Sequence, residues 1–186
     1  MTRIIAGACR GRRLTVPRGR DVRPTSDRVR EAMFSTIESE FGPLSGSRVV
    51  DLFAGSGALG LEALSRGAAH ALLVESDPRA IRAIRTNVEA LGLPGAQVVQ
   101  ASVERALATP AAQPYDVALA DPPYGMPDGD LADVLSRLSM GWLDDDALVV
   151  LERPARAVPL VWPAGLTSVK HRRYGETMLW YGRPAG

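Results

Sequence analysis

The sequence predicts an α/β fold built on an open, mostly parallel sheet of seven strands that ends in an antiparallel hairpin. From residue 48 onward, short apolar runs of strand length alternate with segments of helical periodicity, which is typical of consecutive strand–helix units. The last two such runs, 167–173 and 176–181, flank Tyr174-Gly175, a pair typical of a tight turn. The 186 residues, of which 46% are hydrophobic and 23% charged, can bury one sizeable core.

A small basic arm is expected to precede this sheet. Residues 4–6 and 14–16 are short apolar pieces separated by glycines, which predicts a hairpin. Prolines and a glycine then interrupt the pattern. We therefore divide the chain into an arm, residues 1–24, and a main domain, residues 25–186.

The main domain begins with a helix that Thr25 or Ser26 can cap and that Gly42-Pro43 ends. Asp77-Pro78 opens a second clear helix by the same capping logic, with proline at its first position. Strands are expected from residue 48 and at 70–75, 96–100, 115–120 and 147–151, with helices between Gly57 and Gly67 and at 78–91, 103–108 and 131–138.

The positive charge of the chain is concentrated at its beginning. Residues 1–30 contain nine arginines and two aspartates, a net charge of +7, whereas 13 basic and 19 acidic residues give the remainder −6. A basic arm on an acidic body indicates a polyanionic partner, most simply nucleic acid, although a merely solvated terminus would have the same composition. The residues expected to contact nucleic-acid phosphates are Arg10, Arg12, Arg13, Arg20, Arg23, Arg28 and Arg30, the last two on the exposed side of the first helix.

Other features exclude several classes of protein. No apolar run approaches transmembrane length, and the first residues lack the apolar core of a signal peptide, so we expect a cytoplasmic protein with no membrane partner. Cys9 is the single cysteine, which excludes an internal disulfide. With one cysteine and two distant histidines, His70 and His171, we expect no metal site.

A glycine turn between the first long strand and its helix predicts a nucleotide-like ligand. Gly55 and Gly57 can adopt positive φ and let a ligand approach the backbone. Together with Gly60 they also satisfy the dinucleotide fingerprint, so the turn alone leaves an NAD site open. Asp51 at the strand end would repel a pyrophosphate but attract a cationic ligand. Phe53 lies between them, and we include it among the cofactor-binding residues.

Four successive strands end in polar side chains that could form one site. These are Asp51, Glu75, Ser102 and Asp121. Ligands of open α/β sheets bind at the carboxyl ends of the strands, close to the point where the strand order reverses. Glu75 can accept both ribose hydroxyls of a nucleotide, and the backbone near Ser76 and Ser102 can read an adenine edge.

The segment Asp121-Pro122-Pro123-Tyr124 is the most specific signal in the chain. Two consecutive prolines fix φ and remove both N–H donors, so the turn presents the Asp121 carboxylate and the Pro122 carbonyl as fixed acceptors. Both can point at one planar amino group, which leaves the nitrogen lone pair aimed out of the base plane at an electrophile. Tyr124 can stack on the base that carries the amine.

These motifs resemble a known enzyme class. Asp51–Gly57 and Asp121–Tyr124 are similar to motifs I and IV of the S-adenosylmethionine-dependent amino-methyltransferases, which have a Rossmann-like class I fold. A narrower resemblance, to the bacterial 16S ribosomal RNA guanine-N2 methyltransferase family that modifies guanine 966, covers almost the whole chain. It is carried by Arg3-Ile4-Ile5-Ala6-Gly7, Gly11-Arg12-Arg13-Leu14, Arg23–Glu31 and Tyr174-Gly175-Glu176-Thr177.

The resemblance implies S-adenosylmethionine as cofactor and methylation of a guanine N2 amine. It also implies 16S ribosomal RNA as partner, within a small ribosomal subunit or an assembly intermediate, and we expect a monomer. The implied catalytic residues are Asp121, Pro122, Pro123 and Tyr124. The implied cofactor-binding residues are Asp51, Phe53, Gly55, Gly57, Glu75, Ser76, Ser102 and Asp121.

Other functions share parts of this pattern. A DNA methyltransferase acting on an adenine or cytosine amine would use the same acceptor turn, but such enzymes usually add a target-recognition region for which 186 residues leave little room. A glutamine-amide methyltransferase would not need the arginine arm. A non-catalytic RNA-binding assembly factor would not need Asp121 and Tyr124, and a dehydrogenase has no use for the proline turn.

Overall fold

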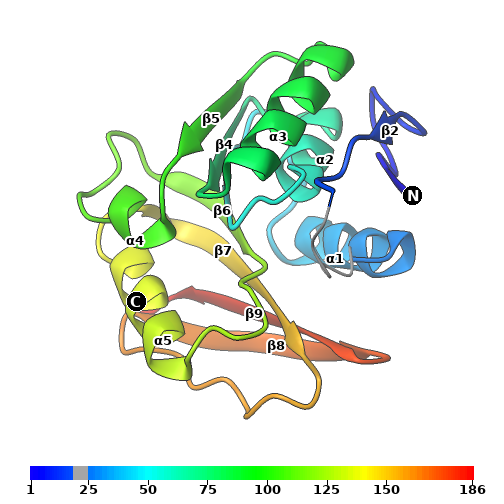
Figure 1. Ribbon diagram of the computed structural model, residues 1–186. Coiled ribbons are helices and arrows are strands. Elements are labelled where there is room, and N and C mark those ends of the chain that lie inside the picture. The colour runs from blue at the N-terminus through cyan, green and yellow to red at the C-terminus, as the bar shows by residue number, and fades with distance from the viewer. Residues whose placement is uncertain (19–24) are drawn as a thin grey trace.

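The computed structural model describes residues 1–18 and 25–186, and it contains a seven-stranded sheet with helices on both faces (Figure 1). The helices are α1 (Asp27–Glu40), α2 (Ala58–Ser65), α3 (Pro78–Leu91), α4 (Val103–Ala106) and α5 (Asp128–Ser139). The strands are β1 (Thr2–Arg3), β2 (Arg13–Leu14), β3 (Arg48–Leu52), β4 (His70–Glu75), β5 (Ala96–Gln100), β6 (Tyr115–Ala120), β7 (Leu143–Pro154), β8 (Leu166–Tyr174) and β9 (Thr177–Pro184).

The large sheet confirms the predicted fold class. Its strand order is β5-β4-β3-β6-β7-β9-β8. The five strands from β5 to β7 are parallel to one another, and β9 pairs antiparallel with both β7 and β8. The chain runs outward from β3 to β5 and then returns to place β6 on the other side of β3. The strand order therefore reverses between β3 and β6, which is where ligands of such sheets bind.

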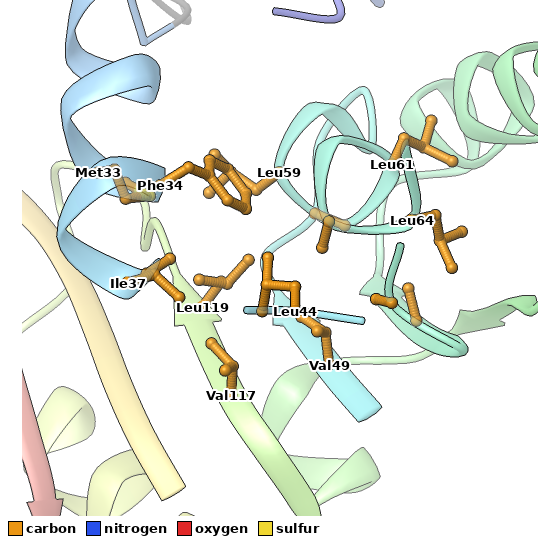
Figure 2. Close-up of a cluster of buried hydrophobic side chains, with 14 of the residues drawn as sticks. Met33, Phe34, Ile37, Leu44, Val49, Leu59, Leu61, Leu64, Val117 and Leu119 are labelled. Carbon is orange, nitrogen blue, oxygen red and sulfur yellow. The ribbon is translucent and has the colours of Figure 1, made fainter. Parts of the chain in front are cut away.

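Two hydrophobic cores fill the space between the sheet and its helices. On one face α1, α2 and α3 pack against β3 and β6, and Figure 2 shows Phe34 of α1 and Leu59 of α2 lying over Val49, Val117 and Leu119. On the other face α4 and α5 cover the alternate residues of the same strands. The central strands are buried on both faces, which explains their nearly continuous apolar sequence.

Several helix ends follow from local chemistry as predicted. Ser26 is the cap of α1 and accepts a hydrogen bond from the Val29 N–H. Asp77 caps α3 in the same way, and Gly92 ends that helix with φ of 61°. Other bounds differ from the prediction, because β7 begins at Leu143 with polar residues that carry no apolar signal. Similarly α5 begins three residues early, at Asp128, and α4 ends at Ala106.

The N-terminal hairpin packs against the helices of the first core (Figure 1). Its strands pair Thr2 with Leu14 and Arg3 with Arg13, slightly earlier than the predicted apolar pieces. Ile4 and Leu14 are buried in the main core, whereas Val16 at the end of the second predicted piece is 43% exposed. Burial of these two side chains thus contributes to fixing the arm on the main domain.

Within the described residues, the structure has no helix that combines the length and the apolar character needed to cross a membrane.

Candidate active site

The turn after β3 has the backbone conformation that its glycines predict. Gly55 and Gly57 have φ of 59° and 82°, and Phe53 also has a positive φ, 60°. Gly57 is the cap of α2 but has no side chain to accept hydrogen bonds, so N–H groups of the first helical turn stay available for a ligand. The positive φ of Phe53, a strained conformation for a residue with a side chain, marks this turn as a candidate ligand contact.

Asp51 lies behind the glycine turn. Its carboxylate accepts a hydrogen bond of 2.9 Å from the Gly60 N–H and is almost completely buried. Burial raises the pKa of Asp51 to about 7, against the opposing effect of the Gly60 bond, and the nearby Glu75 adds to the increase. Asp51 therefore holds the start of α2 against the sheet, and its predicted contact with a cofactor stays a prediction.

Glu75 connects the end of β4 to the glycine turn. Its Oε2 accepts the Gly55 N–H at 2.8 Å, and its Oε1 accepts the Ser76 and Asp77 N–H groups at 2.9 Å each. A carboxylate offers about four acceptor sites, so one remains, enough for one ribose hydroxyl and not for both as the sequence predicted. Ser76 is exposed beside it. Ser102 is exposed as well, and its hydroxyl caps the short helix α4.

The acceptor turn follows β6. Asp121 is partly exposed at the strand end, and within the described chain no N–H or O–H group donates to its carboxylate. Burial, together with the nearby charges of Glu152 and Asp51, raises the pKa of Asp121 well above its ordinary value. After Pro122 and Pro123 the side chain of Tyr124 is 64% exposed, so its ring is free to stack on a base.

Glu152 is a candidate site residue that was not predicted from the sequence. It follows Leu151 of β7, which pairs with Ala120 of β6, so Glu152 lies beside Asp121. The Thr25 hydroxyl donates a hydrogen bond of 2.7 Å to its Oε2. Burial raises the pKa of Glu152, and the Thr25 bond partly opposes this. The sequence does contain a signal for this residue, because Glu152 directly follows the fifth predicted strand just as the other strand-end acids follow theirs.

A cavity of about 270 Å³ lies in front of Asp121. Its wall contains Val16 of the arm, Arg30 of α1, Ser56 of the glycine turn and the Asp121 side chain. The structure thus brings the arm, the first helix, the glycine turn and the acceptor turn together around one space. Concave sites of this kind at a strand-order reversal are typical ligand sites of α/β folds.

The prediction that Arg30 lies on the exposed side of α1 is wrong. Arg30 is 1% exposed, because its spacing from Phe34 and Ile37 places it on the buried side of the helix. Its Nη2 donates to Asp27 at 2.9 Å, but Nε and Nη1 have no hydrogen-bond partner among the described residues. Nη1 is 3.8 Å from a carboxylate oxygen of Glu62, too far for a hydrogen bond. The guanidinium is thus ion-paired with Asp27 but keeps two donors without a hydrogen-bond acceptor, and because Arg30 lines the cavity these donors are candidates to bind a ligand.

The other predicted nucleic-acid contacts lie on the surface or outside the described residues. Arg10, Arg13 and Arg28 are exposed, as is Arg12, whose Nη2 donates to the carbonyl of Ala90 at 2.7 Å. Arg20 and Arg23 lie outside the described residues.

Basic residues from the C-terminal half extend the site beyond the arm. A second cavity of about 260 Å³ is lined by Tyr124, Arg156 and Arg173 together with Pro154 and Glu176. Arg156 and Arg173 were not predicted as site residues, because the segment after β7 and the end of β8 come near Tyr124 only in the folded chain.

Comparison with known proteins identifies the family. Residues 2–183 match the family described as Conserved hypothetical protein 95. The ribosomal RNA small subunit methyltransferase D of Escherichia coli is 39% identical over 165 residues, which cover 86% of this chain and 80% of that protein. The protein of the same name from Haemophilus influenzae is 35% identical over 178 residues, 93% of this chain and 89% of that one.

A solved structure supports the same assignment. The candidate methyltransferase yhhF of Escherichia coli is 34% identical and superposes with a TM-score of 0.84. The match covers 98% of this chain and 97% of that protein. The sequence match and the shared fold agree over nearly the whole length. The chain therefore belongs to the Conserved hypothetical protein 95 family, the family of the ribosomal RNA small subunit methyltransferases D.

Proposed function

We propose that this protein transfers a methyl group from S-adenosylmethionine to the exocyclic N2 amine of a guanine in 16S ribosomal RNA. The observation that carries the proposal is the pair of features at the end of β6, an Asp121 carboxylate to which no group in residues 1–18 or 25–186 donates and an exposed ring at Tyr124. A planar amine on a flat base is the ligand that satisfies both. The name of the Escherichia coli relative, a ribosomal RNA small subunit methyltransferase, supports ribosomal RNA as the polymer that contains the target base.

The residues around the first cavity fit S-adenosylmethionine. The unpaired Nε and Nη1 groups of Arg30 would bind the carboxylate of its amino-acid end, since charge-assisted pairs of this kind satisfy buried guanidinium groups. Ala58 and Leu59 at the start of α2 line this cavity as well. Glu75 lies outside its wall but accepts the Gly55 N–H of the adjoining glycine turn, and its remaining acceptor site would take a ribose hydroxyl. When bound, the cofactor supplies a methyl group whose attachment to a sulfonium makes it electrophilic.

The chain's own chemical task is then to position a poor nucleophile. The lone pair of a guanine amine is delocalised into the ring, so the amine must become pyramidal before it reacts. The Asp121 carboxylate and the Pro122 carbonyl would accept the two amine hydrogens and hold the lone pair out of the base plane. Positive charge develops on the nitrogen as it is methylated, so the Asp121 contact strengthens in the transition state. The raised pKa of Asp121 also makes its carboxylate a better base for the proton that the amine finally loses.

Tyr124 and the basic surfaces around it would hold the RNA. Stacking on an exposed aromatic ring is the usual way in which proteins bind an unstacked RNA base. Arg156 and Arg173 beside Tyr124 can contact the flanking phosphates, and the exposed Arg10 and Arg13 of the arm can contact phosphates further away. We propose a monomer acting on a small ribosomal subunit or an assembly intermediate.

The decisive experiment uses small ribosomal subunits that lack the modification. The protein is incubated with these subunits and methyl-labelled S-adenosylmethionine, and the RNA is digested to nucleosides. We expect labelled N2-methylguanosine with the wild-type protein and almost none with Asp121→Asn. Label in methyladenosine or methylcytidine, or methylation of DNA but not of RNA, would contradict the proposal.

A further inference from the structure

Two carboxylates lie side by side where the acceptor turn begins. Ala120 of β6 pairs with Leu151 of β7, so the next residues, Asp121 and Glu152, extend from adjacent parallel strands. Strands in a sheet are about 4.8 Å apart. Side chains alternate between the two faces, and Leu119, two residues before Asp121, belongs to the core under α1 and α2. Both carboxylates therefore face the cavity side of the sheet.

These two carboxylates have few hydrogen-bond donors of their own. In residues 1–18 and 25–186 the Thr25 hydroxyl is the donor to Glu152, at 2.7 Å, and no group donates to Asp121. Burial raises the pKa of both groups, and the nearby charge of Glu152 adds to the increase at Asp121. A ligand that offers adjacent donors would stabilise the charged forms of both groups.

Two donors of Arg30 that lack a hydrogen-bond partner among the described residues are an independent indication of a ligand in this space. Arg30 is 1% exposed and lines the same cavity as Asp121 and Thr25. Its unpaired Nε and Nη1 cannot reach water as an exposed arginine would. The acidic pair therefore lies at one side of a binding site and not on an ordinary acidic surface.

The bases differ in the donors that their Watson–Crick edges present. Guanine offers N1–H and the N2 amine next to each other, a row of donors. Adenine and cytosine offer an amine next to a ring nitrogen that is an acceptor, and such an acceptor facing a carboxylate is repelled. Two adjacent carboxylates thus match guanine and oppose the other two amine-bearing bases.

We infer that Glu152 is a specificity-determining residue that accepts the N1–H of the target guanine while Asp121 accepts its N2–H. This inference rests on the proposed function, because it assumes that guanine is the base at the site. Glu152 would not touch the reacting nitrogen, and its effect is on which base is accepted.

The test replaces the target guanine by 2-aminopurine in RNA assembled into small subunits. This base keeps the amine at position 2, but its N1 is an acceptor. The kcat/KM of the wild-type protein should be about 10- to 100-fold higher for guanine than for 2-aminopurine. This factor is the range expected for one hydrogen bond to a charged group. Glu152→Gln should lose efficiency on guanine and gain on 2-aminopurine, since its amide can donate to N1. Glu89→Gln, an exposed glutamate of α3, is the matched control and should keep the wild-type ratio.

A binding measurement without turnover gives a second readout. The fluorescence of 2-aminopurine is quenched by stacking, so titration of the labelled RNA reports affinity directly. We expect Glu152→Gln to bind this RNA at least about tenfold more tightly than the wild type does. The affinity for S-adenosylhomocysteine should be the same in both proteins and shows that the variant is folded.

The outcomes separate the two proposals. If the wild-type protein forms no N2-methylguanosine, the proposed function fails and this inference fails with it. If the wild type methylates guanine but uses 2-aminopurine equally well, the role of Glu152 is refuted by a measurement that needs no variant. An equal loss on both bases in Glu152→Gln would also refute it, because a merely structural role would reduce both.

Discussion

Glu62 of α2 holds the N-terminal arm against the main domain, and its removal should destabilise the whole protein. The carboxylate is fully buried, and it accepts the N–H groups of Ile5 and Ala6 at 2.8 and 3.0 Å and the Arg66 Nε at 2.9 Å. Glu62→Ala leaves the Ile5 and Ala6 N–H groups and the Arg66 Nε without their acceptor, and it removes the carboxylate that lies 3.8 Å from the buried Arg30 Nη1. Breaking a buried ionic network in this way costs about 3–5 kcal/mol. At about 2–4 °C per kcal/mol for a chain of this size, the Tm should fall by about 6–20 °C.

The matched control is Glu38→Ala, because Glu38 pairs with the same Arg66. That contact is 3.3 Å long, and the Glu38 side chain is 47% exposed. Exposed pairs contribute about 0–1 kcal/mol, so the control should change the free energy of unfolding very little. Urea and thermal unfolding of both variants measure the difference. A loss below about 1 kcal/mol in Glu62→Ala, or equal losses in the two variants, would show that the arm is not held by this network.

The remaining predictions concern the site. Asp121→Ala should lower kcat by about a hundredfold or more while the affinity for S-adenosylhomocysteine barely changes, as measured by single-turnover methyl transfer and calorimetry; a nearly active variant would contradict the positioning role. Tyr124→Phe should keep most activity and Tyr124→Ala should weaken RNA binding by about 1–3 kcal/mol, because stacking needs the ring and not the hydroxyl; an inactive but folded Phe variant would be evidence against stacking. Asp51 has a raised folded-state pKa, so it binds more protons when folded, and its contribution to stability falls as pH rises from about 4 to 7. The stability of Asp51→Asn relative to the wild type should therefore increase over that range and then level off in urea titrations, and a pH-independent difference would refute the assignment. Arg13→Ala should reduce the slope of log RNA affinity against log salt by about 0.7–0.9 for the lost phosphate contact. Arg82→Ala, at an exposed position of α3, should leave the slope unchanged. Equal slopes in the two variants would show that Arg13 makes no phosphate contact.

The order of elements in the large sheet was predictable because its signals are local. Strand-length apolar runs, caps such as Asp77 and turn residues such as Gly92 each depend on a few neighbouring residues. The confirmed positive φ of Gly55 and Gly57 belongs to the same class of signal. Where local signals were weak, the predicted bounds differed from the structure, as at the polar start of β7.

The candidate site was predicted in part. Asp121 and Glu75 were predicted because each directly follows an apolar run, and the structure confirms their position at the carboxyl edge of the sheet. Glu152 has the same position but was missed, because its importance comes from its neighbour across the strands. Arg30 was wrongly predicted on the exposed side of α1 because arginine is usually exposed. Its spacing from Phe34 and Ile37 already indicated the buried side.

The sequence by itself determined the fold class, the glycine turn, the acceptor turn and the basic character of the arm, since all of these are written in adjacent residues. Only the tertiary structure decided which of these parts meet. The arm reaches Glu62 across 57 residues of sequence, and Glu152 reaches Thr25 across 127. Such contacts depend on strand register and helix packing, which are fixed by the burial of the whole core and not by any local pattern. For this reason the unpaired donors of Arg30 and the paired carboxylates of Asp121 and Glu152 became visible only in the folded chain.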